Sequence, residues 1–341
     1  MYSGGENAAP FAGVIPPAPR GHLPKMDNKK TGERGGGYML MKPLAETAEK
    51  LGVKAEYDIR IRTVVVNDDG RVVGVVARRY GTTITIRAHR GVVLAMGSFA
   101  FDEEMVRDHV PALLGRPGSA IDAHDGRAIR IGQALGAATA HMDAAEVAVH
   151  TSPQLMVRGI IVNAHGQRFI TEDTYPGRIG QAMLFHQNNE AFLILDQRAY
   201  DEVLGGASAG PQPTWVCETA AELEAEMGLP AGTLTSTLSV YNMHAEDGSD
   251  PLFSKNEKWV RPIGTPIAAF DLRGMTSGFP LGGLKTDTDS RVLHISGEPI
   301  PGLFAAGRCT AGVCAGGYAS GASLGDGSFF GRRAGAAAAR G

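Results

Sequence analysis

The 341-residue sequence contains few cysteines. Only three occur, Cys217, Cys309 and Cys314, and they lack the paired spacing of a zinc site. An odd and scattered set excludes a disulfide framework and is typical of a protein from a reducing compartment. We therefore expect no metal site and a cytoplasmic location.

Long apolar runs and clusters of basic residues are also missing. The longest apolar stretches, such as Gly91–Gly97 and Ala334–Ala339, are too short to cross a bilayer. The N-terminus has no basic-then-apolar signal pattern. The net charge is −3, and no stripe of Lys and Arg is present. These absences predict no transmembrane segment and argue against nucleic acid as a partner.

Glycine, in contrast, is abundant. The 46 glycines concentrate at Gly35–Gly37, Gly282–Gly283 and Gly307–Gly331, where the backbone must turn tightly or approach something closely. None of these clusters forms the Gly-x-Gly-x-x-Gly fingerprint of a dinucleotide-binding βαβ unit.

The first part of the chain predicts loop, helix and then strands. Residues 1–34 are proline-rich and without period, and Tyr38–Leu51 has helical spacing that stops at Gly52. The Asp-Gly pair at Asp69-Gly70, between β-branched runs, is a strong hairpin signal. The continuous apolar run Gly91–Ala95 predicts a parallel strand buried on both faces. The expected strands are Val53–Ile61, Thr63–Asn67 paired with Arg71–Arg79, Thr82–Ala88 and Gly91–Ala95.

From about residue 155 to 262 the pattern changes. Gly159–Asn163 and Arg168–Ile170 predict a hairpin, and Ala191–Asp196 predicts a strand. Helices are expected at Ala220–Met227 and Thr233–Glu246, the second with Leu234, Leu238 and Tyr241 on one face. Elsewhere the sequence predicts a helix at Arg127–Leu135, a strand at Gly302–Ala306 and a final helix from about Ser323.

Six short segments have specific sequences, and two of them are glycine-containing strand ends. Pro301–Arg308 is Pro-Gly-Leu-Phe-Ala-Ala-Gly-Arg, and Gly91–Phe99 ends in Ala-Met-Gly-Ser-Phe. Taken in the order in which they occur along the chain, the six segments resemble motifs of the FAD-dependent fumarate reductase/succinate dehydrogenase flavoprotein superfamily. The resemblance covers the chain from about residue 35. The segments are Gly91–Phe99, His124–Gly126, Gly159–Arg168, Leu238–Asn242, Leu281–Asp287 and Pro301–Arg308.

A helix start near the C-terminus agrees with this resemblance. Gly321–Leu324 precede the final helix, so the unpaired N–H groups of its first turn and its dipole suit an anionic partner. Taken alone, the glycine could simply allow the chain to enter the helix. Together with the Ala-Ala-Gly strand, the resemblance implies FAD as the cofactor. The implied cofactor-binding residues are Met96, Gly97, Ser98, Asp125, Ala306, Gly307, Arg308, Gly321, Ala322, Ser323 and Leu324.

The superfamily opens with a βαβ unit that carries Gly-x-Gly-x-x-Gly, which this sequence lacks. We therefore expect a chain that is N-terminally truncated, split or mis-started, and weak FAD binding by this chain alone. The implied fold is α/β, a Rossmann-like FAD-binding domain without its N-terminal βαβ unit and with an inserted α+β capping (substrate) domain. The expected division is 1–34 as an irregular start, 35–154 and 263–341 as the FAD-binding domain, and 155–262 as the capping domain.

The segments near the expected active site favour one substrate class. Fumarate reductases, which clamp two carboxylates, have an arginine where Tyr318 stands here and a histidine pair where Gly278 and Phe279 stand. A dicarboxylate would be poorly held without such cations. Tyr318–Arg333 and Glu172–Gln181 instead resemble the 3-ketosteroid Δ4-(5α)-dehydrogenases, as does Tyr38–Leu44.

That resemblance implies Tyr318, Ser320 and Tyr175 as catalytic residues and a 3-ketosteroid as substrate. Desaturation beside a ketone removes a proton from the α carbon and a hydride from the β carbon. A phenol that hydrogen-bonds the ketone acidifies the α C–H bond, and a second tyrosine with a serine can take the proton. We assign the ketone to Tyr318, and proton removal to Tyr175 with Ser320. Alternatively, Tyr175 is a loop tyrosine held by Pro176.

Two alternatives remain open at this stage. One is another flavin desaturase or ene-reductase of the superfamily, such as a Δ1-ketosteroid dehydrogenase. The other is an inactive fragment or one subunit of a split enzyme, which the missing Gly-x-Gly-x-x-Gly unit favours. The sequence does not specify the electron acceptor.

Overall fold

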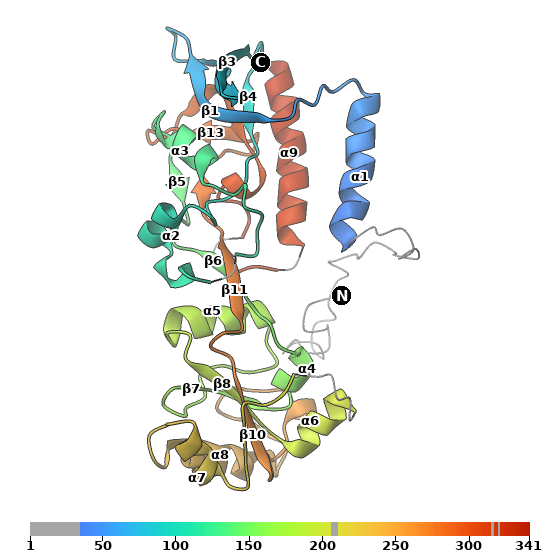
Figure 1. Cartoon of the computed structure of the whole chain (residues 1–341), viewed down its shortest axis with the longest axis vertical. Helices are drawn as coiled ribbons and strands as arrows, with labels where there is room; N and C mark the ends of the chain where they lie inside the picture. The colour runs from blue at the N-terminus through green and yellow to red at the C-terminus, as the bar shows by residue number, and fades with distance from the viewer. Residues whose placement is uncertain (1–34, 117, 206–210, 315–316, 320) are drawn as a thin grey trace.

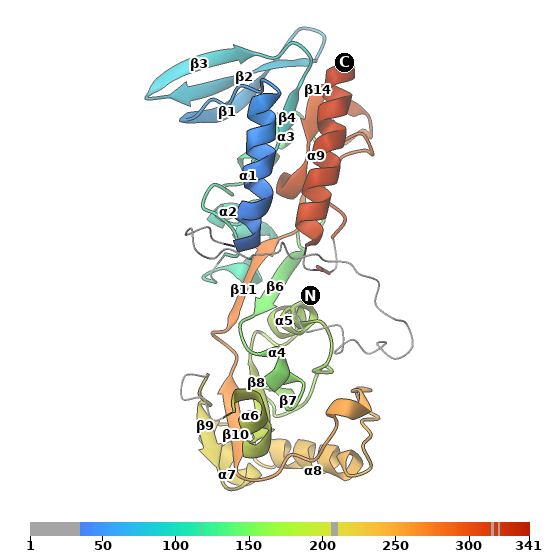
Figure 2. The same ribbon diagram turned by 90° about the vertical axis from the view of Figure 1, so that its right-hand side faces the viewer.

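The computed structural model describes residues 35–116, 118–205, 211–314, 317–319 and 321–341. The expected irregular start, residues 1–34, and the predicted catalytic Ser320 lie outside the described residues. The chain forms an elongated mixed α/β structure with two lobes stacked along its long axis (Figure 1). Segments from both ends of the sequence build the upper lobe, and the middle of the chain builds the lower lobe (Figures 1 and 2).

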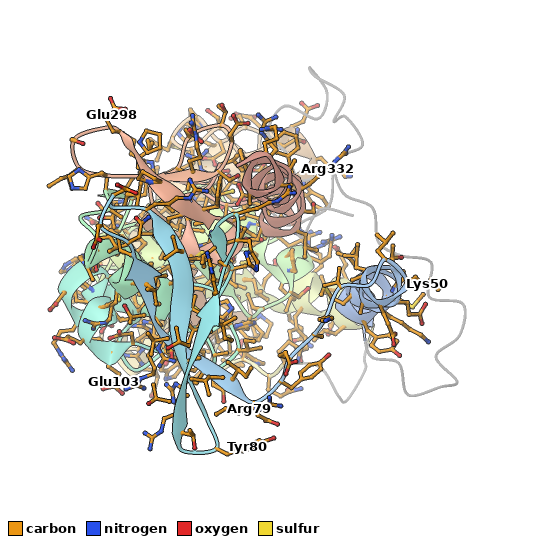
Figure 3. The ribbon with its side chains drawn as sticks, turned by 90° about the horizontal axis from the view of Figure 1, so that it is seen from above. Lys50, Arg79, Tyr80, Glu103, Glu298 and Arg332 are labelled. Atoms are coloured by element: carbon orange, nitrogen blue, oxygen red, sulfur yellow. The ribbon has the colours of Figure 1, made fainter. Side chains whose placement is uncertain are left out.

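Helix α1 (Gly35–Lys50) starts three residues before its predicted start and ends before Gly52, whose φ of +78° terminates it. It runs alongside α9 (Ala322–Arg340), and Figure 3 shows Lys50 and Arg332 on these separate helices. Apolar side chains of α1 are exposed, for example Met41 at 58% and Leu44 at 52%. No helix among the described residues is long and apolar enough to span a membrane.

A three-stranded antiparallel meander follows, made of β1 (Ile59–Val66), β2 (Val72–Arg79) and β3 (Thr82–Arg87). The predicted Asp-Gly hairpin is confirmed, with Gly70 at φ +77°. Arg79 and Tyr80 mark the turn between β2 and β3 (Figure 3). The strand predicted at Val53–Ile61 is wrong up to residue 58, because residues 53–58 are exposed and have no core against which to alternate.

The central sheet of the upper lobe has the order β13-β14-β4. β4 (Val92–Leu94) pairs in parallel with β14 (Pro299–Ala305), with Val93 opposite Phe304, so segments 211 residues apart in sequence lie side by side. β13 (Arg291–Leu293) pairs antiparallel with β14. Because β4 is an edge strand, Val93 is 39% exposed, and the prediction that this strand is buried on both faces is wrong.

Two layers of side chains cover this sheet. On one side Leu94, Leu303 and Ala305 join a core that includes Phe99 and Ile129. On the other side α9 packs through Ala334 and Ala337 against Phe304 and Ala306. The smaller elements of this lobe are α2 (Glu103–His109), η3 (Pro111–Leu113), α3 (Arg127–Gln133), β5 (Thr139–Ala140), β12 (Gly283–Leu284) and η5 (Gly307–Cys309).

A two-stranded antiparallel ribbon joins the lobes (Figures 1 and 2). It consists of β6 (Ala145–Val149) and β11 (Thr276–Pro280), with Glu146 opposite Phe279 and Val147 opposite Gly278. A Cβ on Gly278 would lie 2.4 Å from the Glu146 carbonyl oxygen, so the two strands need glycine here. This close approach fixes the register of the ribbon.

The lower lobe is built on the antiparallel sheet β7-β8-β10-β9. Its strands are β7 (Ile160–Asn163), β8 (Ala191–Asp196), β10 (Ile267–Asp271) and β9 (Trp215–Cys217), and its helices are α4 (Pro153–Met156), α5 (Pro176–His186), α6 (Gln197–Leu204), α7 (Ala220–Glu226), α8 (Thr233–Ala245) and the short η4 (Glu257–Trp259). The helix predicted at Thr233–Glu246 is confirmed, and its three predicted face residues, Leu234, Leu238 and Tyr241, are buried.

The predicted hairpin of Gly159–Asn163 with Arg168–Ile170 is reduced to a single bridge between Val162 and Arg168, and β7 pairs with β8 instead. Arg168 enters a buried ion cluster, where its Nη2 lies 2.8 Å from Glu172 Oε2 and 2.9 Å from Asp250 Oδ2. Lys255 Nζ lies 3.2 Å from Glu172 Oε2 and donates to the Gly159 carbonyl. The side chain of Arg168 is held in this ion cluster, and the chain around it does not form the second strand of the predicted hairpin.

Glu172→Gln should destabilise the protein strongly. The substitution leaves Arg168 and Lys255 in the interior without their shared carboxylate, and breaking a buried ion pair from one side costs about 3–5 kcal/mol. Chemical denaturation measures the change in the free energy of unfolding. Exposed Glu246→Gln is the control and should change it by less than about 0.5 kcal/mol; equal effects of the two variants would contradict the role of the cluster.

Candidate functional site

Two turns meet at one edge of the central sheet. β4 continues into Met96–Ser98 and β14 into Ala306–Arg308. The Ala306 N–H donates to the Leu94 carbonyl at 3.0 Å, and Cys309 Sγ lies 3.2 Å from the same oxygen. The carboxyl ends of parallel strands are the usual ligand-binding edge of an open α/β sheet.

The first turn depends on Gly97, whose φ is +82°. A Cβ at this position would lie 2.4 Å from the His124 ring, so Gly97 and His124 pack directly together. The Ser98 N–H donates to His124 Nδ1 at 3.3 Å, and Ser98 Oγ lies 3.1 Å from the same atom. Burial, together with the charge of Arg308, lowers the pKa of His124, so the imidazole is neutral at pH 7 and can accept.

Asp125 borders a cavity next to this turn. Its carboxylate lies 2.7 Å from Arg127 Nη2 and 3.2 Å from Arg60 Nη2. The cavity has a volume of about 530 Å³ and is lined by Ile59, Arg60, Ile61, Met96, Asp122, Ala123, Asp125 and Arg127. The structure thus places the predicted residues Met96 and Asp125 together. It adds two arginines that the sequence analysis missed, because only the fold brings Arg60 beside Asp125.

Helix α9 begins next to the second turn. Gly321, with φ +89°, is its N-cap, and Ala322, Ser323 and Leu324 form the first turn. Ser323 Oγ is buried and has no hydrogen-bond partner among the described residues. A Cβ on Gly327 would lie 3.7 Å from the Gly307 Cα, so the first turns of α9 pack on the turn after β14. The predicted residues Ala306–Arg308 and Gly321–Leu324 therefore belong to neighbouring elements.

Tyr318 lies at this helix start. The Ser323 N–H donates to Tyr318 Oη at 3.4 Å, a long hydrogen bond. The Tyr318 ring meets the Phe279 ring edge-on, with centroids 5.5 Å apart. Phe279 belongs to β11 of the ribbon that joins the lobes, and the Arg308 guanidinium carbon lies 5.2 Å from the centroid of its ring. The phenol predicted to bind the ketone thus lies between the helix N-terminus and the ribbon that joins the lobes.

Tyr175 occupies a different element. It is the N-cap of α5, and its ring covers Gly177, where a Cβ would lie 2.6 Å from the ring carbon Cε1. Helix α5 packs on β6, with Gln181 Nε2 donating to the Ala145 carbonyl at 2.7 Å. Tyr175 and Tyr318 therefore belong to elements that pack on the same ribbon. That they act in one site with Ser320 stays a prediction.

The sequence analysis missed a buried carboxyl on this ribbon. Glu146 is 8% exposed and lies directly opposite Phe279, so the two side chains share one face of the ribbon. Burial raises the pKa of Glu146 to about 7. A single acid inside the otherwise apolar strand Ala145–Val149 was the signal that could have identified it. The described residues contain no group of three or more His, Cys, Asp and Glu side chains that could hold a metal ion.

Comparison with known proteins identifies the class. The family model described as an FAD binding domain matches residues 4–324. The chain belongs to this family, within the fumarate reductase/succinate dehydrogenase flavoproteins, and FAD is its cofactor.

Particular relatives narrow the resemblance. The crystal structure of a 3-ketosteroid Δ4-(5α)-dehydrogenase from Rhodococcus jostii RHA1, in complex with 4-androstene-3,17-dione, is 66% identical. It superposes with a TM-score of 0.92 over 99% of this chain and 71% of that chain. This similarity confirms the resemblance inferred from Tyr318–Arg333 and Glu172–Gln181.

Two curated relatives are more distant. A 3-oxosteroid 1-dehydrogenase from Mycobacterium tuberculosis is 30% identical, covering 84% of this chain and 60% of the relative. A probable fumarate reductase from Shewanella frigidimarina is 27% identical, covering 91% of this chain and 54% of the relative. The chain thus spans little more than half the length of these two proteins.

The residues at the sheet edge fit FAD. Ser323 Oγ and Arg308 Nε are buried polar atoms without a hydrogen-bond partner among the described residues, as expected where a polar ligand binds. The helix N-terminus at Gly321 suits the negative charge of a reduced flavin. The two glycine turns, at Gly97 and Gly307, have positive φ, a conformation that favours glycine.

Glu146→Gln should change how stability depends on pH. The pKa of Glu146 is raised in the folded state, so the folded protein loses stability as pH rises from about 4.5 through 7, where the buried carboxyl must ionise. Glutamine cannot ionise, so the variant should be more stable than the parent by about 2–3 kcal/mol at pH 8 and equal to it near pH 4. Urea denaturation at both pH values measures the difference.

The control is Glu298→Gln, at an exposed position labelled in Figure 3. It should leave the pH dependence of unfolding unchanged. A Glu146→Gln variant with the same free energy of unfolding as the parent at pH 8 would show that water or another group stabilises the ionised carboxylate.

Proposed function

We propose that this chain forms the substrate-binding and flavin-binding part of an FAD-dependent 3-ketosteroid dehydrogenase. The reaction removes a proton from the carbon next to the ketone and a hydride from the carbon after it. The observation that carries the proposal is the position of Tyr318, with its phenol oxygen 3.4 Å from the Ser323 amide nitrogen at the start of α9. The relative from Rhodococcus jostii, whose structure contains a steroid diketone, supports this substrate class.

The proposed cofactor contacts are the two sheet-edge turns, Met96–Ser98 and Ala306–Arg308, the first turn of α9, Gly321–Leu324, and Asp125. When bound there, FAD supplies the hydride acceptor. The chain's own residues orient the substrate and move the proton. The half-buried Tyr318 donates a hydrogen bond to the ketone oxygen, which gains negative charge as the α C–H bond breaks.

Tyr175 and Ser320 are proposed to remove that proton. Support comes from the packing of α5, which Tyr175 caps, against the same ribbon that Tyr318 contacts through Phe279. A tyrosine removes a proton efficiently only when its surroundings favour the phenolate, and a serine can relay the proton to it.

A dicarboxylate is a poor substrate for this site. The face of β11 near Tyr318 offers Phe279, an aromatic ring, instead of a cation. Arg308 is the one guanidinium among the described residues that contacts Phe279, and clamping two carboxylates needs more than one such cation. An apolar ring system with a single ketone matches this lining better than two carboxylates do.

We further propose a domain division that follows the two lobes. Residues 35–154 and 263–341 form a Rossmann-like FAD-binding domain, and residues 155–262 form a capping α+β domain. The exposed edge of β4, with Val93 39% accessible, supports an additional parallel strand at this edge. The Gly-x-Gly-x-x-Gly fingerprint of a dinucleotide-binding βαβ unit, which would supply such a strand, does not occur in the sequence.

The substrate assay tests the proposed function. The FAD-loaded protein should reduce an artificial electron acceptor with 5α-saturated 3-ketosteroids and not with fumarate or succinate. Steroids that are already unsaturated at the 4,5 bond but saturated at the 1,2 bond separate the Δ4 from the Δ1 activity. Turnover of the second set alone would favour a Δ1-dehydrogenase, and activity on dicarboxylates alone would overturn the proposal.

Tyr318→Phe should abolish most steroid desaturation and leave bound flavin in place. Phenylalanine keeps the ring that packs on Phe279 and removes one hydrogen bond to an oxygen that gains charge. Loss of such a donor costs about 3–4 kcal/mol, or roughly a hundred- to thousandfold in kcat. Steady-state kinetics and the flavin absorbance of the same sample measure both effects.

The control is Tyr200→Phe in the lower lobe, whose hydroxyl donates to the Pro211 carbonyl. It should leave the rate constant within twofold of the parent. Near-normal turnover of Tyr318→Phe would show that another group polarises the ketone.

A further inference from the structure

Two arginines among the described residues, Arg168 and Arg308, have very different surroundings. Arg168, in the lower lobe, faces two carboxylates, at 2.8 Å and 2.9 Å, and its side chain is 4% exposed. Arg308, at the sheet edge, has no carboxylate within ion-pair distance in the part of the chain that the structure describes. Arg168 therefore pairs with carboxylates of the folded chain itself, and Arg308 does not.

The contacts of Arg308 hold its position without neutralising its charge. Nη2 donates to the Pro280 carbonyl, and the guanidinium lies over the Phe279 ring at 5.2 Å. Nε is buried and has no hydrogen-bond partner among the described residues. A carbonyl and an aromatic ring attract a cation, but neither carries a net charge.

The acids nearest to Arg308 attract its charge from beyond ion-pair distance. Tyr318 is a phenol, and Asp326 is held by a hydrogen bond from the Val313 N–H at 3.3 Å and by contact with Gly312. Burial raises the pKa of Asp326, and the Val313 hydrogen bond and the charge of Arg308 act on that pKa in the opposite direction. Burial also lowers the pKa of Arg308, so the protein keeps this cation at a cost in stability.

A half-buried cation without an ion-pair partner among the described residues, at a ligand-binding edge, suits a ligand that brings negative charge. Hydride transfer gives FAD two electrons and one proton, so the flavin ring gains one negative charge, while the substrate loses the hydride and, separately, a proton. Reoxidation by the electron acceptor removes that charge. The negative charge that the flavin ring itself would offer to Arg308 is therefore present only in the reduced half of the cycle, whereas the pyrophosphate of FAD is negative in both halves.

We propose that the half-buried Arg308 guanidinium favours the reduced, electron-rich flavin and so sets the redox preference of the site. This inference rests on the proposed function, since it requires FAD at the sheet edge. It assigns a task to an arginine that would otherwise serve only to hold the end of β11.

Redox titration of the FAD-loaded protein tests the proposal. Arg308→Gln should weaken the preference for reduced over oxidised flavin by ten- to a hundredfold, which lowers the midpoint potential by about 30–60 mV for a two-electron couple. Arg308→Lys keeps the charge and should recover most of the difference. The control is Arg332→Gln, an exposed arginine on α9 (Figure 3), which should leave the potential unchanged.

The ligand-free chain provides a second readout that needs no flavin. If Arg308 is an uncompensated cation, Arg308→Met should raise the melting temperature, because an apolar side chain of similar length packs on Phe279 without the cost of a buried charge. If Arg308 has only a structural role, the same substitution should lower the melting temperature. An unchanged midpoint potential in Arg308→Gln, or a lower melting temperature in Arg308→Met, overturns the proposal.

These outcomes are distinct from a failure of the proposed function. An FAD-loaded protein that desaturates steroids with the same potential in Arg308→Gln removes only the role of Arg308. A protein that shows the expected potential shift and has no activity on 3-ketosteroids keeps the role of Arg308 and removes the substrate assignment.

Discussion

The parallel pairing of β4 with β14 is the contact on which the rest of the site depends. It joins residues 92–94 to residues 303–305 and leads the turns that follow both strands to one edge of the sheet. Without this pairing, the turn that contains Gly97 would not lie beside the turn that contains Gly307 and Arg308. The Ala306 to Leu94 hydrogen bond continues the pairing one step beyond the strands, into the turns themselves. Helix α9 can then pack on Gly307 because the sheet has already fixed that turn.

The β6–β11 ribbon connects the sheet edge to the other lobe. Its close strand approach at Gly278 and the contact of Gly180 in α5 with Val147 leave no room for side chains, so the ribbon and α5 fit together in one way. One face of the ribbon presents Phe279 to Tyr318 and Arg308, and the same face holds Glu146. Groups that we propose to bind the cofactor and groups that we propose to bind the substrate therefore meet on two strands, and a relative movement of the lobes would act directly on this contact.

Local signals in the sequence were enough for the elements that depend on local chemistry. The Asp69-Gly70 turn, the helix at Thr233–Glu246 and the strand Ala191–Asp196 follow from turn residues and periodicity, and the motifs around Gly97 and Gly307 identified the flavin family. Tertiary context decided the rest. Val53–Asp58 alternates like a strand but has no core to face, and Val93 is exposed because β4 lies at the edge of its sheet. Arg60 approaches Asp125, and Glu146 approaches Phe279, only through pairings that no local pattern contains.

Arg168 and Arg308 differ in how their charge is balanced, and the proposed role of Arg308 rests on that difference. Arg168 and Lys255 share Glu172, and Asp250 also pairs with Arg168, so each cation in this cluster faces a carboxylate. Such a cluster is balanced within the folded chain, so it needs no charge from a ligand. Arg308 sits in a folded chain that could have placed a carboxylate beside it, as it does for Arg168, and places an aromatic ring and a carbonyl there instead. A fixed counter-ion would hold the charge equally in every state of the cofactor, whereas a charge left without one responds when negative charge arrives. The absence of a carboxylate partner among the described residues is thus what would suit Arg308 to the proposed site, whose charge would change during turnover.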